Sequence, residues 1–469
     1  MMHRLLSLLV LICSITVQAK VVLPDQISSH MVLQQQTDAK LWGWTKSGTK
    51  VSVNVSWNQD TYTTKADASG RWEVFVKTPA ASFVPQTVTI SDGEPCVLED
   101  VLIGEVWLAS GQSNMQMPLR GFWNCPVEES AQVIALSAQY KNRIRFATIE
   151  QQVCFEPADK AKGTWKVCTP ANAGNFGATA FYFAENLTRI LDVPVGIINN
   201  AWGGSLIEGW FPADILKEYG EAYTKEEILK EKQDYHRREI MYNGVHHPII
   251  GYTIKGCIWY QGESNVGRHT TVPERMSRLI NLWRSEWKQG DFPFYMVEIA
   301  PYEYGYDPQG AFLREAQHKV CDITPNTGIV STSDLVYPYE KNQIHPCQKE
   351  KVGQRLSYLA LTETYKVEGM PGYSPKYKSM EIKDGKVLLT FDHAWDAFNT
   401  VDEMEGFEIC GFDRKFVPAK AKASNRDIIV YSDAVKEPVA VRYCFHNFAI
   451  GTVKGANGLP LIPFRTDNF

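Results

Sequence analysis

The strongest chemical signal in this chain is a serine set between a glycine and two amide residues. The motif GQSNM occupies residues 111–115 and directly follows an apolar run at 101–109. Such a run is typical of a strand buried on both faces of a parallel sheet, and ligands bind beyond the carboxyl ends of such strands. Ser113 is therefore placed as a nucleophile, and its backbone N–H as an oxyanion donor. On placement alone, a helix N-cap is the more common role for such a serine.

A nucleophilic serine needs a base, and His345 is the candidate. It lies in the segment NQIHP at 342–346, before a helical stretch at 348–361. His246 and His247 are adjacent in the chain and so point to different sides of regular structure. We expect them to be surface or supporting groups rather than metal ligands.

Two further polar segments follow predicted strands. The first, AWGGS at 201–205, contains Gly203 and Gly204, whose backbone N–H groups are able to approach a ligand. The second, QGESN at 261–265, supplies amide donors and a carboxylate; its polar members are Gln261, Glu263 and Asn265. Each segment alone is a weak signal. Three of them after three strands indicate an acyl-transfer site.

Alternating strands and helices must position these segments. We expect strands at 195–199, 254–259 and 294–299, and helices at 181–191, 223–238 and 275–287. This rhythm predicts an α/β fold with a parallel sheet over residues 101–365. Period-two alternation before and after it predicts an N-terminal β-sandwich at 20–100 and a C-terminal β-sandwich at 366–469.

The first 19 residues are typical of a signal peptide, with Arg4, a short apolar run at 5–12 and a small-residue cleavage site ending at Ala19. We therefore expect an exported protein, periplasmic or extracellular. Export permits disulfides, and the candidate pairs are Cys154 with Cys168 and Cys410 with Cys444. The cysteines and histidines show no zinc-ligand spacing.

Composition narrows the function further. Hydrophobic residues make up 44% and charged residues 22%, as in ordinary globular proteins. Lys plus Arg number 48 against 53 Asp plus Glu, a net charge of −5. This balance argues against nucleic acid as the main partner. No apolar stretch after the signal is long enough to span a membrane, and the composition leaves the oligomeric state open.

Taken together, the motifs resemble the sialate O-acetylesterase family of SGNH-type carbohydrate esterases. The resemblance lies in GQSNM at 111–115, WGGS with EGW at 202–210, IWYQGESN at 258–265, REAQ at 314–317 and IHP at 344–346, and it extends across the mature chain. It implies an α/β/α sandwich in which His345 activates Ser113 to form an acetyl-enzyme. The oxyanion would be held by N–H groups of Ser113 and of Gly203 or Gly204, together with Gln261 or Asn265. No metal or cofactor is required.

One departure from the family stands out. The family places an aspartate two residues before the histidine, and related enzymes place it three before; here these positions hold Gln343 and Asn342. Neither side chain supplies the negative charge that stabilises an imidazolium. Our prediction is that Glu263 partners His345, with Asp334 as the alternative acid. Two alternatives remain: Asn342 or Gln343 orients the His345 ring, or the activity is reduced.

The substrate is the least defined part. Arg120, Trp202, Trp210 and Trp259 are candidates for sugar contact, although core packing is an equal alternative for each tryptophan. O-acetylated sialic acids are the predicted substrates. Acetylated xylan or another glycan is the alternative, and a carbohydrate-binding protein with a degenerate site is the alternative of another class. We also expect Arg314 and Glu315 to form a buried ion pair that supports the site.

Overall fold

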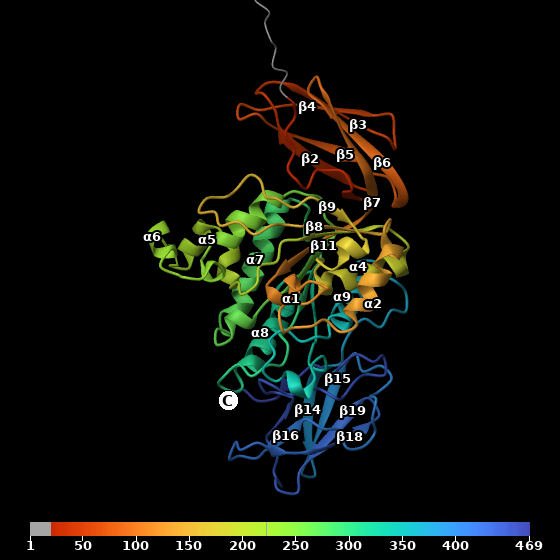
Figure 1. The fold of residues 1–469 in the computed structure, drawn as a ribbon. Helices are drawn as coiled ribbons and strands as arrows, with labels where there is room; N and C mark the ends of the chain where they lie inside the picture. The colour runs from red at the N-terminus through yellow and green to blue at the C-terminus, as the bar shows by residue number, and fades with distance from the viewer. Residues whose placement is uncertain (1–19, 222) are drawn as a thin grey trace, which may run out of the picture.

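The computed structural model describes residues 20–221 and 223–469. The predicted signal peptide at 1–19 lies outside the described residues. Three regions follow one another along the long axis of the molecule: an N-terminal β region, a central α/β region and a C-terminal β region (Figure 1). Within the described residues, no helix has the length and apolar character needed to cross a bilayer.

The central sheet has the order β13-β12-β11-β7-β10-β8-β9. All neighbouring pairs are parallel except β8 and β9. The bounds are β7 Pro95–Gly111, β8 Ile144–Thr148, β9 Trp165–Val167, β10 Val195–Asn199, β11 Gly256–Tyr260, β12 Phe294–Val297 and β13 Thr327–Val330. Every residue of β10, β11 and β12 is buried, which explains the continuous apolar runs in the sequence.

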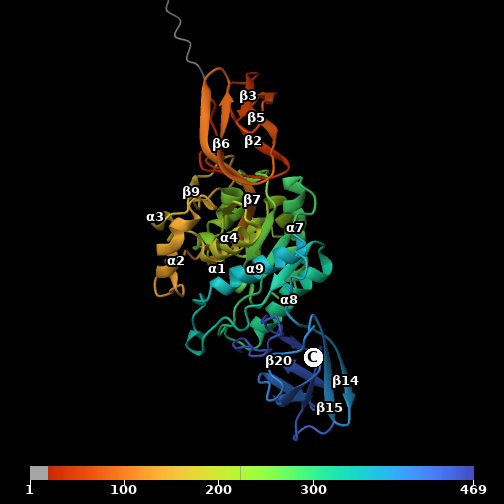
Figure 2. The same ribbon diagram turned by 90° about the vertical axis from the view of Figure 1, so that its right-hand side faces the viewer.

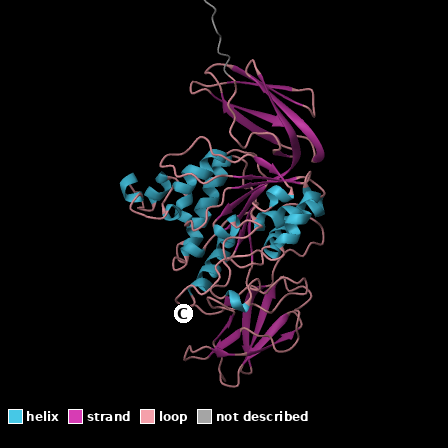
Figure 3. Ribbon diagram, viewed as in Figure 1, coloured by secondary structure: helices cyan, strands magenta, loops and turns pink. Residues whose placement is uncertain are grey.

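Helices cover both faces of this sheet (Figures 1 and 3). On β11, Trp259 packs into the same core as α7 Val272–Trp287 and α8 Gln309–Ile323. Its neighbours Ile258 and Tyr260 face the other core, with α4 Ala178–Leu191 and α9 Glu350–Glu363, which are seen from the front in Figure 2. Successive side chains of the strand thus point into two different apolar layers, one on each face of the sheet. The predicted α/β fold with a parallel sheet is confirmed. The shorter helices are α1 Ser113–Gln116, α2 Ser130–Leu136, α3 Pro170–Ala173, α5 Ala213–Glu218 and α6 Lys225–Ile228.

The N-terminal β region is joined to the centre by a single strand. β7 pairs with β6 near its start and with β10 and β11 near its end. The predicted boundary after residue 100 lies inside this strand, so the two regions share continuous backbone. The remaining strands are β1 Val32–Gln34, β2 Asp38–Trp44, β3 Lys50–Val55, β4 Thr61–Lys65, β5 Arg71–Lys77 and β6 Ser82–Ser91.

The C-terminal β region contains two four-stranded sheets, β14-β15-β19-β18 and β17-β16-β20-β21. It docks on the central region through side chains: His446 contacts Asp307 at 2.6 Å, and Arg465 pairs with Glu315. Within the C-terminal region, His446 also contacts Glu408 at 2.8 Å. The bounds are β14 Lys376–Lys383, β15 Lys386–Asp392, β16 Phe407–Cys410, β17 Val417–Pro418, β18 Lys420–Ser424, β19 Asp427–Tyr431, β20 Ala440–Tyr443 and β21 Phe464–Arg465.

Two predictions about local structure are wrong. The charged stretch 223–238 is not one helix; it contains only α6 and a single turn at Asp234–His236. A segment without an apolar stripe has no face to bury, so packing does not sustain a long helix there.

The predicted disulfides are also absent, because all nine cysteines of the described residues are free thiols. Cys410 pairs with Ala440 across β16 and β20, which puts Cys444 roughly 13 Å further along the strand, too far for a disulfide. The buried Cys168 thiol donates instead to the Ser137 carbonyl at 3.5 Å.

Candidate active site

Ser113 is held by backbone geometry at the end of β7. The strand ends at Gly111, whose φ is +122°, and a Cβ there would collide with the carbonyl oxygen of Tyr260 on the neighbouring strand β11. The Gln112 N–H donates to that same carbonyl at 2.8 Å. Ser113 then begins helix α1, partly exposed. The glycine is needed because only a residue without a side chain allows this close approach.

Gly203 is brought beside the serine from the loop after β10. A Cβ on Gly203 would lie 3.3 Å from the Ser113 Cβ. The Gly203 N–H donates to Oε1 of Gln116 at 2.7 Å. Among the described residues, the Ser113 N–H donates to no acceptor, as expected for the first residue of a helix. Gly204 instead turns towards the ring of Tyr235.

His345 is brought close to Ser113 by a contact between their chain neighbours, Asn114 and Ile344. Asn114 donates from Nδ2 to the Ile344 carbonyl at 3.0 Å, and its Oδ1 accepts from Lys349 at 2.7 Å. The two catalytic candidates are therefore neighbours in space although they are far apart in the chain. The described residues contain no direct hydrogen bond between the Ser113 hydroxyl and the His345 ring; such contacts often tighten only in complexes.

The His345 ring is half-buried and packs against uncharged groups. Its Nδ1 lies 3.6 Å from the Cys125 sulfur, and the edge of Phe122 lies against it with ring centroids 5.3 Å apart. Burial, assisted by the positive charge of Lys349, lowers the pKa of His345 to about 4. The imidazole is thus neutral at physiological pH, which is the form a general base requires.

Neither predicted acid partners His345. Glu263 is buried, but its Oε1 accepts from Asn114 Nδ2 at 2.6 Å. Burial raises the pKa of Glu263, with the Asn114 hydrogen bond and Lys349 opposing that shift. Asp334 accepts two hydrogen bonds from Arg355, at 2.7 and 2.8 Å, and also pairs with Lys454. Glu263 therefore holds Asn114, which links the serine segment to the histidine segment. Asp334 instead joins Arg355 to Lys454, away from the His345 ring.

Within the described residues, the two amide residues before the histidine make no direct hydrogen bond to its ring. Gln343 Oε1 accepts from the Cys125 thiol at 3.3 Å and from the His345 backbone N–H at 3.3 Å. Asn342 is exposed. Gln343 therefore reaches the ring only through Cys125.

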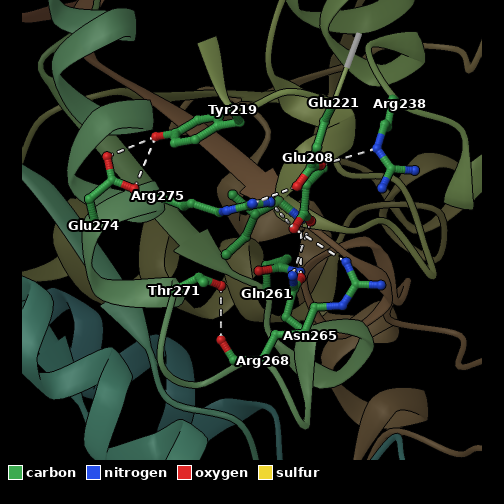
Figure 4. A network of polar contacts seen from close by, with 11 residues as sticks. Glu208, Tyr219, Glu221, Arg238, Gln261, Asn265, Arg268, Thr271, Glu274 and Arg275 are labelled. Atoms are coloured by element: carbon green, nitrogen blue, oxygen red, sulfur yellow. Dashed lines mark hydrogen bonds and ion pairs between the residues drawn. The ribbon is translucent and has the colours of Figure 1, made fainter. Parts of the chain in front are cut away.

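Gln261 and Asn265 serve a structural network rather than the serine (Figure 4). Both amide hydrogens of Gln261 are used, by Ser205 O at 3.0 Å and by Asn265 Oδ1 at 2.7 Å. Asn265 donates to the buried Glu208 at 3.1 Å, which also pairs with Arg275. In this arrangement both amide hydrogens of Gln261 and one of Asn265 have partners other than the serine, and the oxyanion role of the two amides stays a prediction.

The predicted sugar-contacting tryptophans lie in the core. Trp210 and Trp259 pack edge to face with centroids 5.5 Å apart, and Trp202 is also buried. Arg120 is exposed. Trp123 is instead 89% exposed, and it lies in the turn whose Phe122 and Cys125 contact the His345 ring.

Two other groups differ from expectation. Arg314 and Glu315 do not pair with each other: Arg314 donates to the His446 carbonyl, and Glu315 pairs with Arg465. His246 is fully buried against Trp283, so the supporting role expected of it corresponds to core packing. Five further residues surround the site and were not predicted from the sequence, namely Asn114, Gln116, Phe122, Cys125 and Lys349. Asn114 and Gln116 adjoin the serine motif, and Lys349 follows His345 by four residues, whereas Phe122 and Cys125 carry no pattern.

A serine beyond a parallel sheet, a neutral histidine and paired backbone donors define a hydrolase of the esterase class. The family described as carbohydrate esterase, sialic acid-specific acetylesterase, matches residues 103–362. The chain belongs to this family and is a carboxylic ester hydrolase.

Individual relatives agree. Sialate O-acetylesterase of Mus musculus is 27% identical over 484 residues, covering 89% of this chain and 88% of the relative. The human protein of the same name is 26% identical over 456 residues, covering 89% and 86%. A crystal structure of a carbohydrate acetylesterase from Xanthomonas citri superposes with a TM-score of 0.85 at 32% identity, covering 96% of this chain and 100% of that one.

Proposed function

We propose that this chain is an SGNH-type serine esterase that removes O-acetyl groups from carbohydrates through an acetyl-serine intermediate. The observation that carries the proposal is the hydrogen bond from Asn114 to the Ile344 carbonyl, which links the segments of Ser113 and His345, with Gly203 packed against Ser113. A structural serine would need neither a neutral histidine nor two unoccupied or exchangeable backbone donors beside it.

The proposed reaction follows from these groups. Neutral His345 takes the proton from the Ser113 hydroxyl, and Oγ attacks the acetyl carbonyl. His345 then gives the proton to the departing sugar oxygen, which leaves an acetyl ester on Ser113. A water molecule, deprotonated by His345, attacks this ester and releases acetate. The steps need no metal or cofactor.

The backbone N–H groups of Ser113 and Gly203 are the proposed oxyanion donors. The Gln116 side-chain oxygen already accepts from Gly203 at 2.7 Å, so a carbonyl-type oxygen fits this position. The substrate oxygen would replace it, and Gln116 would turn aside. Aiming fixed donors at the developing charge is commonly the largest single contribution to such catalysis.

Sialic acids carrying O-acetyl groups are the first proposed substrates, in keeping with the mammalian relatives. Acetylated xylan or another glycan is the second, because the Xanthomonas citri relative is described only as a carbohydrate acetylesterase. Trp123 is a suitable stacking surface for the sugar ring, since exposed aromatic faces pack well on apolar sugar faces. A carbohydrate-binding protein without turnover is the remaining alternative.

Hydrolysis of a chromogenic acetate ester tests the chemistry. Ser113→Ala should lower kcat by at least about 10⁴-fold. Ser130→Ala, which changes another serine at a helix start, should leave the rate unchanged. Mass spectrometry after rapid acid quench should find an acetyl group on Ser113. Wild-type activity in Ser113→Ala would refute the proposal, and an inactive wild-type protein that binds glycans would favour the binding alternative.

Acetate release from O-acetylated sialosides and from acetylated xylan tests the substrate. The preferred glycan should lose kcat/KM in Trp123→Ala, whereas the small chromogenic ester should not. Phe412→Ala removes another aromatic ring, 81% exposed in the C-terminal region, and should change neither rate.

Export is a separate proposal that rests on the sequence at 1–19. Sequencing the N-terminus of protein produced in its own cells should find Lys20 as the first residue. Retention of Met1 in an intracellular fraction would refute it.

A further inference from the structure

The Nδ1 side of the His345 ring meets a thiol. Cys125 Sγ lies 3.6 Å from Nδ1, and the two residues are 220 positions apart in the chain. The two predicted acids, Glu263 and Asp334, have other partners. The groups that face the ring are therefore this thiol, the Phe122 edge and, through its charge, Lys349.

The position of the Cys125 thiol is set by its own turn and by the loop that carries His345. Phe122 and Cys125 exchange two backbone hydrogen bonds, at 2.9 and 3.0 Å, and so form a tight turn with Trp123 and Asn124 at its tip. Gly121, at φ +79°, opens this turn, and a Cβ there would lie 2.5 Å from the Cys125 carbonyl oxygen. The backbone thus sets the position of the sulfur.

Gln343 closes the arrangement from the histidine's own loop. Its Nε2 donates to the Asn124 carbonyl at 3.1 Å, which leaves Oε1 to face the Cys125 thiol and the His345 backbone N–H, both at 3.3 Å. One amide group thereby ties the turn at 122–125 to the segment that carries the histidine.

The contact with Gln343 assigns the thiol hydrogen and, through it, the tautomer of the ring. Gln343 Oε1 is only an acceptor, so the Cys125 thiol must donate to it. The sulfur lone pairs then remain to accept from His345 Nδ1–H. A histidine protonated at Nδ1 has its unshared electron pair on Nε2, which is the nitrogen a general base uses towards the serine.

We propose that Cys125 and Gln343 are positioning residues that hold His345 in this orientation and tautomer, in the place where an aspartate would otherwise act. The proposal rests on the proposed function, because it assigns His345 as the base. Unlike a carboxylate, the thiol and amide carry no negative charge. They select the reactive tautomer but do little to stabilise the imidazolium.

Four variants test the arrangement, each assayed on a chromogenic acetate ester across pH. Cys125→Ala should lower kcat by about 10- to 100-fold, part of the 10²–10⁴ that a general base contributes, with KM little changed. Cys125→Ser keeps a donor and an acceptor and should recover part of the loss. Gln343→Leu should resemble Cys125→Ala. Gln343→Glu places a carboxylate beside the thiol, which should stabilise the imidazolium and move the acid limb of the kcat profile to higher pH.

Matched controls separate position from folding. Cys96→Ala removes a partly buried thiol from the N-terminal region and should leave kcat and its pH profile unchanged. Cys125 and Gln343 belong to one series of hydrogen bonds that ends at His345. The double variant Cys125→Ala with Gln343→Leu should therefore lose little more kcat than either single variant. If Cys125→Ala does not fold, Cys125→Ser against Gln343→Leu supplies the same comparison.

The outcomes distinguish the two proposals. Loss of activity in Ser113→Ala, with Cys125→Ala and Gln343→Leu indistinguishable from Cys96→Ala in kcat and pH profile, would overturn the positioning role and leave the esterase function intact. Full activity in Ser113→Ala would overturn both. Loss in Cys125→Ala, partial recovery in Cys125→Ser and a moved acid limb in Gln343→Glu would support the positioning role.

Discussion

The serine side and the histidine side of the site are built by different means. Backbone holds Ser113: strand β7, the turn at Gly111 and helix α1 place it, and Gly203 approaches because it has no side chain. Side chains hold His345, which sits in a loop and depends on Phe122, Cys125 and Asn114 through its neighbour. Substitutions on the serine side should therefore cause large losses of activity. Substitutions on the histidine side should cause smaller losses that depend on the chemistry of the new side chain.

The largest effect should come from the backbone side. Gly203→Ala places a Cβ 3.3 Å from Ser113 Cβ and 2.8 Å from Gln116 Oε1, so the Gly203 N–H must move from the oxyanion. We expect kcat to fall by about 10²–10³, the usual result of losing one such donor. Steady-state kinetics measures this. Gly174→Ala, whose nearest contact would be 3.6 Å away, is the control and should retain its rate.

A smaller effect should follow when the connection between the two sides is cut. Asn114→Ala removes the contact to Ile344 and leaves Glu263 and Lys349 without their shared partner. We expect the free energy of unfolding to fall by about 1–3 kcal/mol and kcat to fall as His345 loosens. Urea unfolding and kinetics on the same samples measure both. Asn172→Ala, which loses one local hydrogen bond, should keep its kcat; equal kcat in the two variants would argue against the connection.

The histidine side should be visible in the pH profile. Because His345 acts in its neutral form and its pKa is lowered to about 4, kcat/KM should rise with pH through about 4, not through the ordinary value near 6.5. Lys349→Met removes a positive charge that disfavours the imidazolium, so the pKa of His345 and the acid limb should move to higher pH. Lys341→Met, an exposed lysine paired with Glu303, should leave the limb in place. An acid limb near 6.5 in the wild type would contradict the buried, neutral environment.

The smallest effect on catalysis should come from the C-terminal region, which neither side uses. Contact with Glu408, and then with Asp307, raises the pKa of His446 to about 9. A raised pKa means that this contribution to stability is full below about 6.5 and is lost as pH rises through about 9. His446→Gln should lower thermal stability at pH 7 and should leave kcat unchanged. The stability of the variant should also fall less than that of the wild type as pH rises through about 9. Thermal melts between pH 6 and 10 compare the two proteins, and a lower kcat in the variant would show that docking reaches the site.

The sequence by itself determined the α/β fold, most of the buried strands, the family and the serine motif. These features depend on short-range order: an apolar strand, a glycine that permits a turn and a serine at the start of a helix lie within a dozen residues of each other. The histidine was found by its own motif. Its neutral, buried state was not visible, because burial depends on segments from several parts of the chain.

Only the tertiary structure decided what surrounds the histidine. Glu263 and the amides of its segment were expected to serve catalysis, and packing directs them to Asn114, Ser205 and Glu208 instead. Trp210 and Trp259 were candidates for the substrate, and alternation along the strands and helices turns them into the core. Cys125 showed no pattern in the sequence, yet its sulfur meets His345 across 220 positions. The physical reason is that backbone motifs specify their own local geometry, whereas the partner of a loop side chain is set by how distant segments pack together.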